Sequence, residues 1–120
     1  RTKAAALFHK DWGNGVNFED LPAKTGAYME ERIHFIVMQN PVLLDDTAGL
    51  LRYMGLESLG IPVLLLDGIE SPPIIAAVHD ELARRLPQVQ RVTLQGAGHM
   101  LPITHAAAVA PLVQAHLAAS

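Results

Sequence analysis

The chain has 120 residues, of which half are hydrophobic and 18% are charged, enough apolar material for one globular core. It contains no cysteine, which excludes a thiolate nucleophile, a cysteine zinc site and a disulfide framework. Nine Lys and Arg against twelve Asp and Glu give a formal net charge of -3, so no basic footprint for nucleic acid exists. No apolar run approaches the ~20 residues of a membrane span. Because a full signal-peptide core is also missing, we expect a soluble, cytoplasmic protein without a membrane partner.

The first half of the chain predicts helices separated by turns, and we assign residues 1–60 to a helical segment. An amphipathic helix is predicted from Ala23 to Gln39, ended by Asn40-Pro41 because proline disfavours helical geometry in the preceding residue. A shorter helix is predicted over residues 47–54, before Gly55. The apolar face of the longer helix consists of Met29, Ile33, Ile36 and Val37.

The second half, residues 61–120, alternates strands and helices. The run from Val63 to Leu66 is continuously apolar between Pro62 and Gly68, which is typical of a strand covered on both faces. Residues 90–95 alternate apolar and polar side chains and predict a second strand. A helix opened by Ser71-Pro72-Pro73 and ended by Pro87 connects them, with Ile74, Val78, Leu82 and Leu86 on one face. The last helix is predicted from about Thr104 or His105.

This order is a βαβα unit, whose two strands should be parallel. Two parallel strands cannot bury an apolar run or satisfy their own edges, because such strands persist almost only inside larger covered sheets. We therefore expect a larger α/β sheet. Further chain or a homo-oligomer would complete it.

The Gly96-Ala97-Gly98 turn and the histidine that follows it carry the strongest chemical signal. Open α/β sheets place their ligands at the carboxyl ends of parallel strands, where His99 is predicted. An imidazole titrates near neutrality and can act as a general base and then as an acid. A loop histidine that only forms local hydrogen bonds is the alternative interpretation.

Three segments together resemble the C-terminal end of an α/β-hydrolase: Ile61 to Pro73, the helix ending at Leu86-Pro87, and Arg91 to Met100. His99 stands at the position of the catalytic histidine in this resemblance. Residues 1–60 are similar in texture to the helical cap of such enzymes. The resemblance implies an α/β fold, with the C-terminal βαβα portion of a hydrolase parallel sheet preceded by a helical cap-like segment. It also implies a cofactor-independent serine hydrolase that cleaves ester, lactone or carbon-carbon bonds in a small ester-like molecule.

The sequence departs from this family at the nucleophile. The family carries its serine in a Gly-x-Ser-x-Gly elbow, and no such pattern occurs here. The serines of the chain, none of them in an elbow, are Ser58, Ser71 and Ser120. The chain would therefore supply a histidine but no nucleophile, and we expect it to be inactive alone. The alternative is a non-catalytic fragment or binding module that retains hydrolase packing.

The acid partner of His99 has several candidates. Many family members carry an aspartate three residues after the glycine that corresponds to Gly68, and Ser71 occupies that position here. Glu70 lies beside it and is assigned to orient the imidazole, although a solvated turn carboxylate would look the same. The remaining candidates are Asp45, Asp46 and Asp67.

No metal or cofactor is expected. The chain has neither a His-x-Glu-x-His nor a His-Glu-x-x-His pattern. The other histidines lie on predicted helices, near a helix start or without a paired ligand. The two glycine-rich turns, Gly13-Asn14-Gly15 and Gly96-Ala97-Gly98, are too short for a phosphate loop or a dinucleotide fingerprint.

Overall fold

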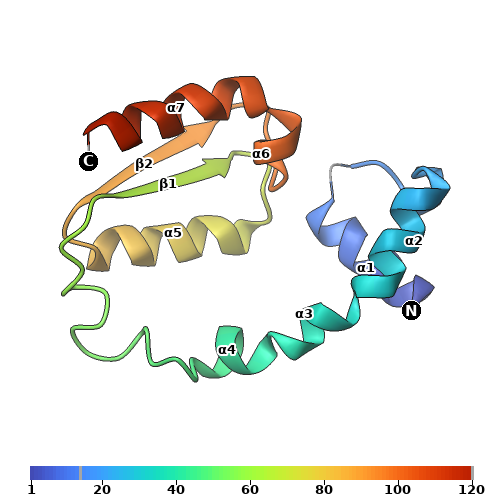
Figure 1. Cartoon of the computed structure of the whole chain (residues 1–120), viewed down its shortest axis with the longest axis horizontal. Helices are drawn as coiled ribbons and strands as arrows, with labels where there is room; N and C mark the ends of the chain where they lie inside the picture. Colours follow the sequence, from blue (N-terminus) through green and yellow to red (C-terminus); the bar gives the residue numbers. More distant parts are fainter. Residues whose placement is uncertain (14, 120) are drawn as a thin grey trace. The chain divides into compact units, whose positions relative to one another are not determined.

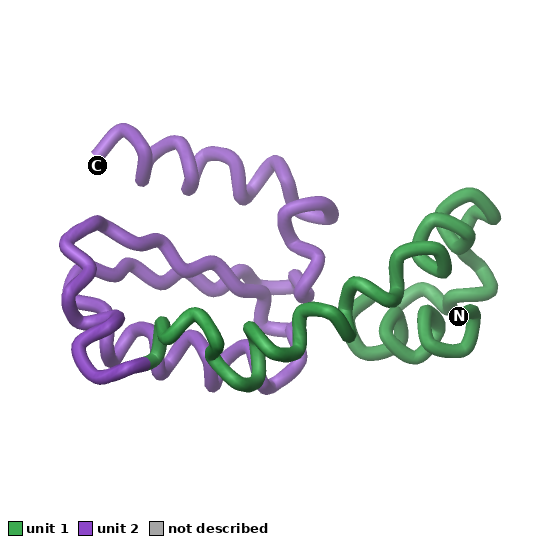
Figure 2. The backbone as a smooth tube through the Cα atoms, turned by 60° about the horizontal axis from the view of Figure 1, so that its bottom comes forward, with its two compact units in different colours: residues 1–51 green, residues 52–120 purple. Residues whose placement is uncertain are grey.

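The computed structural model describes residues 1–13 and 15–119 and shows a mixed α/β chain (Figure 1). The chain forms two compact units, residues 1–51 and 52–120, which Figure 2 distinguishes by colour. Residues 52–60, grouped with the helical half in the sequence, belong to the second unit. No helix among the described residues has both the length and the hydrophobicity to cross a membrane.

The first unit is helical. Its elements are α1 (Thr2–Trp12), the 3-10 helix η1 (Phe18–Asp20), α2 (Ala23–Arg32), α3 (His34–Met38) and α4 (Asn40–Asp45). The predicted helix over residues 23–39 is interrupted at Ile33, between α2 and α3. The predicted helix ends at Met38, just before Asn40-Pro41 as expected, but a further short helix, α4, begins at Asn40. Proline is tolerated in the first helical turn, where its missing N–H would have had no partner.

The helix predicted over residues 47–54 does not form. Asp46 adopts a left-handed conformation with φ 45°. Its side chain accepts hydrogen bonds that backbone carbonyls would accept in a helix. Its two carboxylate oxygens accept from the backbone N–H groups of Leu50 and Leu51, each at 2.8 Å. Aspartate favours such local side-chain hydrogen bonds over helix continuation, so the segment folds into turns.

The second unit contains β1 (Val63–Gly68), α5 (Pro73–Arg85), β2 (Val89–Leu94), α6 (Leu101–Thr104) and α7 (Ala106–Ala119). The strands pair in parallel from Val63↔Val89 to Gly68↔Leu94, and α5 connects them, as the sequence predicted. Figure 1 shows α5 and α7 on opposite sides of this sheet. The last helix begins later than expected, because Leu101-Pro102 starts the separate helix α6.

The predicted apolar face of α5 is right at Leu82 and Leu86 but wrong in the first half of the helix. Leu86 is buried, but Ile74 and Val78 are 55% and 46% exposed. Ile75 and His79 lie on the less exposed side instead. In β1, the apolar run from Val63 to Leu66 was predicted to be covered on both faces. It is only partly buried, and Leu65 is its most buried leucine.

A bidentate ion pair connects residues 52–60 to α5. Arg85 donates from Nε and Nη2 to the two carboxylate oxygens of Glu57 at 2.6 and 2.9 Å, and from Nη2 to the Arg52 carbonyl at 3.0 Å. The hydrogen bond from Arg85 lowers the pKa of Glu57 from 4.5 to about 2. The segment is thus attached to the helix by a charge-assisted contact.

Candidate functional site

The turn after β2 presents His99 at the carboxyl end of the parallel strands. Gly96 takes φ +68°, a left-handed conformation that glycine adopts without steric cost. Ala97 is fully buried, and its carbonyl accepts a hydrogen bond from the Glu70 N–H at 2.9 Å. The Gly98 carbonyl accepts from the Leu101 N–H at 3.2 Å. His99 therefore sits between a turn joined to the end of β1 and the start of α6.

Gly68 allows this close approach of two backbones. A Cβ atom at this position would meet the Gly98 carbonyl oxygen at 2.8 Å and the carbonyl group of Ala97 even closer. Only glycine has no atom there. The end of β1 and the turn carrying His99 consequently pack backbone against backbone.

A cavity of about 400 Å³ lies beside His99 within the second unit. Its lining residues are Leu66, Asp67, Ser71, Ile75, His79, His99, Met100, Leu101, Pro102 and Ile103. They come from the carboxyl end of β1, the start of α5, the turn after β2 and α6. The cavity thus combines a mostly apolar wall with a few polar side chains, the usual character of a small-molecule site.

Asp67 is the most buried charged group beside this cavity. It is 3% exposed, and its Oδ2 accepts a hydrogen bond from Nη2 of Arg91 at 2.8 Å. Nδ1 of His79 lies 3.3 Å from the same oxygen, and Arg91 also bonds the carboxylate of Asp80. Burial raises the pKa of Asp67. The hydrogen bonds from the Thr93 hydroxyl and the Arg91 guanidinium lower it by more than burial raises it, so this pKa lies below its usual value.

Several buried polar atoms in this region have no hydrogen-bond partner within the part of the chain that the structure describes. They are Oδ1 of Asp67, Oγ of Ser71, Nδ1 of His79 and Nε of Arg91. Buried polar atoms are nearly always hydrogen-bonded in folded proteins. The first three belong to residues that line the cavity, but the atoms themselves are sealed from solvent.

The predicted acid partners have different positions. Glu70 is exposed, is not among the residues lining the cavity, and forms no hydrogen bond or ion pair through its carboxylate within residues 1–13 and 15–119. Asp67 shares the cavity with His99. Asp45 and Asp46 belong to the first unit, where Asp46 holds a turn. The structure therefore brings Asp67 and Ser71, but not the Glu70 carboxylate, to the cavity that His99 lines.

His79, expected on a helix either half-buried or exposed, lies half-buried on α5, but its contact with Asp67 was not predicted. Ile75 and His79 are four residues apart in α5 and so share one side of this helix. The strand pairing explains why Asp67 and Arg91 lie close together. Asp67 and Arg91 lie on the same face of the sheet, since Leu65 pairs with Arg91 and Asp67 with Thr93.

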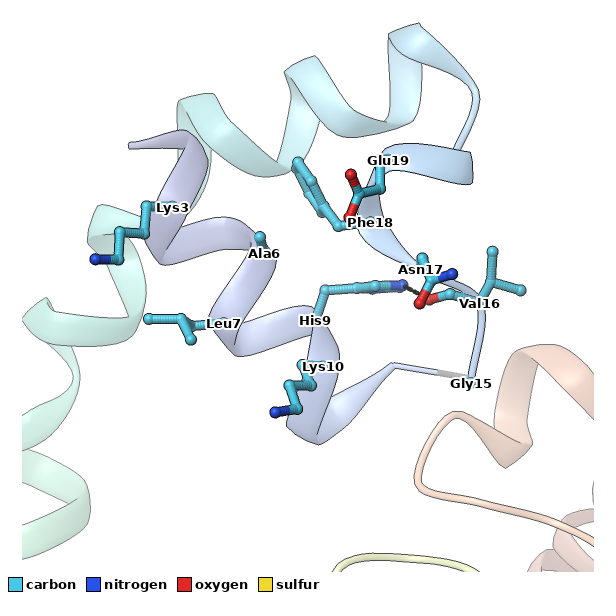
Figure 3. A pocket seen from close by; sticks show the side chains of 10 residues that line it. All are labelled: Lys3, Ala6, Leu7, His9, Lys10, Gly15, Val16, Asn17, Phe18 and Glu19. Atoms are coloured by element: carbon cyan, nitrogen blue, oxygen red, sulfur yellow. Dashed lines mark hydrogen bonds between the residues drawn. The ribbon is translucent and has the colours of Figure 1, made fainter.

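A second cavity of about 330 Å³ lies in the first unit, beside α1 and η1 (Figure 3). His9 points across it, as Figure 3 shows, and its Nε2 forms a hydrogen bond with the Val16 carbonyl at 2.9 Å. Its ring also contacts the Phe18 ring edge-on. His9 thus joins α1 to the following loop, which is a structural role.

No cluster of three or more His, Cys, Asp or Glu suited to a metal ion occurs in the described ranges. Comparisons with protein families, with curated proteins and with solved structures find no match for this chain.

Proposed function

We propose that this chain supplies the general base of a cofactor-independent serine hydrolase, and that His99 is this base. One observation carries the proposal: an imidazole in a turn at the carboxyl end of two parallel strands lines a cavity of about 400 Å³. Ligands of open α/β sheets bind at such strand ends. The proposed substrates are small molecules with an ester, lactone or activated carbon-carbon bond.

In the proposed reaction, His99 removes the proton from a serine hydroxyl as its oxygen attacks the carbonyl carbon of the substrate. The imidazolium then gives this proton to the leaving group, and water releases the acyl group by the same steps. The nucleophilic serine lies outside these 120 residues, because no serine of the chain has the elbow pattern.

Glu70 is proposed to orient the imidazole. Its peptide N–H is bonded to the Ala97 carbonyl, two residues before His99. Its exposed carboxylate has no other hydrogen bond within the described residues, so the side chain can rotate toward the ring. Replacing Glu70 with glutamine tests this role, since it keeps the size of the side chain and removes its charge.

The test uses the natural gene product that carries residues 1–120. Hydrolysis of p-nitrophenyl butyrate and serine labelling by a fluorophosphonate are measured for the wild type, His99→Ala and His34→Ala. His34 is the control, because it is exposed and its contacts are local: Nδ1 with the Glu31 carbonyl and the ring with Phe35. Loss of His99 should reduce the rate about 10³-fold or more. A reduction below about tenfold, roughly 1.4 kcal/mol of barrier, would refute the assignment.

A non-catalytic binding module is the second candidate. Ser71 at the position of the family's aspartate favours it, because a hydroxyl cannot stabilise an imidazolium as a carboxylate does. A gene product that neither hydrolyses esters nor reacts with the fluorophosphonate would support this candidate over the enzyme.

A further inference from the structure

We infer that the cavity in the first unit binds a small monocarboxylate with an apolar body, its negative group held between Lys3 and Lys10. The inference concerns a site separate from the proposed hydrolase, because His99 belongs to the second unit. All residues that line the cavity belong to α1, η1 and the loop between them. Its volume of about 330 Å³ lies within the range of small-molecule sites.

Lys3 and Lys10 supply the positive charge of the site. They are seven residues apart on α1, and both side chains extend from the same side of the helix with Leu7 between them (Figure 3). Seven residues of an α-helix rise about 10 Å, so two four-carbon lysine side chains can reach one group between them. Neither ammonium group forms an ion pair or hydrogen bond within residues 1–13 and 15–119. Both charges are therefore available to a ligand.

The rest of the wall suits an apolar body. Leu7 and Val16 line the cavity although they are 56% and 44% exposed. A ligand that covers these two side chains removes apolar surface from water, which favours binding. The rings of His9 and Phe18 also line the cavity and contact each other edge-on, so an aromatic ligand ring has aromatic neighbours there.

Glu19 limits the ligand to a single negative charge. Its exposed side chain also lines the cavity and lies next to Phe18 (Figure 3). Two lysines and one glutamate among the lining residues leave one positive charge in excess when His9 is neutral. A second negative group on the ligand would face Glu19, and a cationic ligand would face the two lysines. A monoanion matches the charge of the cavity.

Isothermal titration calorimetry of the natural gene product that carries residues 1–120 tests the inference with three ligands of one carbon skeleton. The ligands are 3-phenylpropanoate, 3-phenylpropan-1-ol and 3-phenylpropylamine. The carboxylate should bind saturably with a Kd of about 1 mM, an ordinary affinity for so small a ligand. The alcohol lacks the charge and should bind about threefold to tenfold more weakly, and the amine should bind no better than the alcohol. Added NaCl should weaken the binding of the carboxylate only.

Two pairs of variants then locate the site. Lys3→Gln combined with Lys10→Gln should weaken carboxylate binding about threefold to tenfold, whereas Lys24→Gln should leave it unchanged. Lys24 is an exposed lysine of α2 outside the cavity. Ala6→Phe should abolish binding, because the larger side chain occupies the cavity, whereas Ala4→Phe, at an exposed position outside the cavity, should not. Far-UV circular dichroism checks that all variants keep the wild-type fold.

Three results would overturn the inference: no saturable binding of the carboxylate, binding of the alcohol or the amine as tight as that of the carboxylate, or equal effects of the lysine double variant and Lys24→Gln. Undiminished binding by a folded Ala6→Phe variant would overturn it as well. If Ala6→Phe does not fold, the three ligands and the lysine variants decide alone. The hydrolase proposal depends on the activity of His99→Ala and fails or stands separately from these results.

Discussion

Replacing Gly68 with alanine should displace the turn that carries His99. The new Cβ atom would lie 2.8 Å from the Gly98 carbonyl oxygen and closer still to the Ala97 carbonyl group. Both are backbone groups and cannot move aside as a flexible side chain does. Overpacking costs about 1–3 kcal/mol, and loss of the Glu70 to Ala97 hydrogen bond adds about 1 kcal/mol. We therefore expect destabilisation of about 3 kcal/mol.

This magnitude is large for the second unit. A unit of about 70 residues has a stability of roughly 3–10 kcal/mol, so Gly68→Ala should remove a third or more of it. Gly60→Ala is the matched control, because a Cβ atom at Gly60 would have no neighbour within 4 Å. It should be neutral or slightly stabilising, since alanine restricts the unfolded chain.

Urea unfolding followed by far-UV circular dichroism measures both variants. Amide hydrogen exchange at Ile69 and Glu70, whose N–H groups bond to Leu94 and Ala97, reports on the contact itself. Gly68→Ala should exchange faster at these two amides than the wild type and unfold at lower urea. Equal midpoints for Gly68→Ala and Gly60→Ala would show that the two backbones do not pack as described.

Three further outcomes follow from the second unit. Asp67→Asn should cost about 2 kcal/mol, because the charge-assisted hydrogen bond between Arg91 and Asp67 is weakened while Arg91 keeps its bond to Asp80, and thermal unfolding should show a melting temperature about 10 °C lower. The folded pKa of Glu57 is lowered to about 2, so its stabilisation is present above pH 4.5 and is lost as the pH falls toward 2; Glu57→Gln should flatten this slope in acid titrations of unfolding. Gly96→Ala should cost about 1 kcal/mol in urea unfolding, from its φ of +68° alone.

The strand pair was predictable because its signals are local. A continuous apolar run after Pro62 and an alternating run before Gly96 each fit one secondary structure, and a helix-length segment between them implies a parallel crossover. The position of His99 follows, since a turn must come directly after the second strand. The hydrophobic pattern and the turn residues are thus sufficient to predict β1, β2 and the turn that follows β2.

The inward face of α5 could not be chosen from periodicity. Ile74 and Ile75 are adjacent and begin two apolar stripes that differ by one residue. The polar residues on the facing side of the sheet distinguish them, because Asp67 lies 3.3 Å from His79 in the stripe of Ile75. That contact joins distant parts of the sequence, so local reasoning could not anticipate it. The same limit explains why Asp67, Ser71 and His79 were not predicted to line the cavity beside His99.

The carboxylates considered as partners of His99 differ in how many hydrogen bonds their oxygens already accept. Both oxygens of Asp46 accept backbone N–H groups, and Oδ2 of Asp67 accepts from Arg91 beside the ring of His79. Turning either carboxylate toward another imidazole would break contacts that hold a turn or the interface of α5 with the sheet. The Glu70 carboxylate forms no hydrogen bond within the described residues, and the Glu70 peptide N–H donates to the Ala97 carbonyl in the turn that carries His99. Among these carboxylates, Glu70 is therefore the one whose reorientation would break the fewest contacts, which is why it is kept as the proposed partner of His99, while Asp67 holds α5 to the sheet through Arg91 and His79.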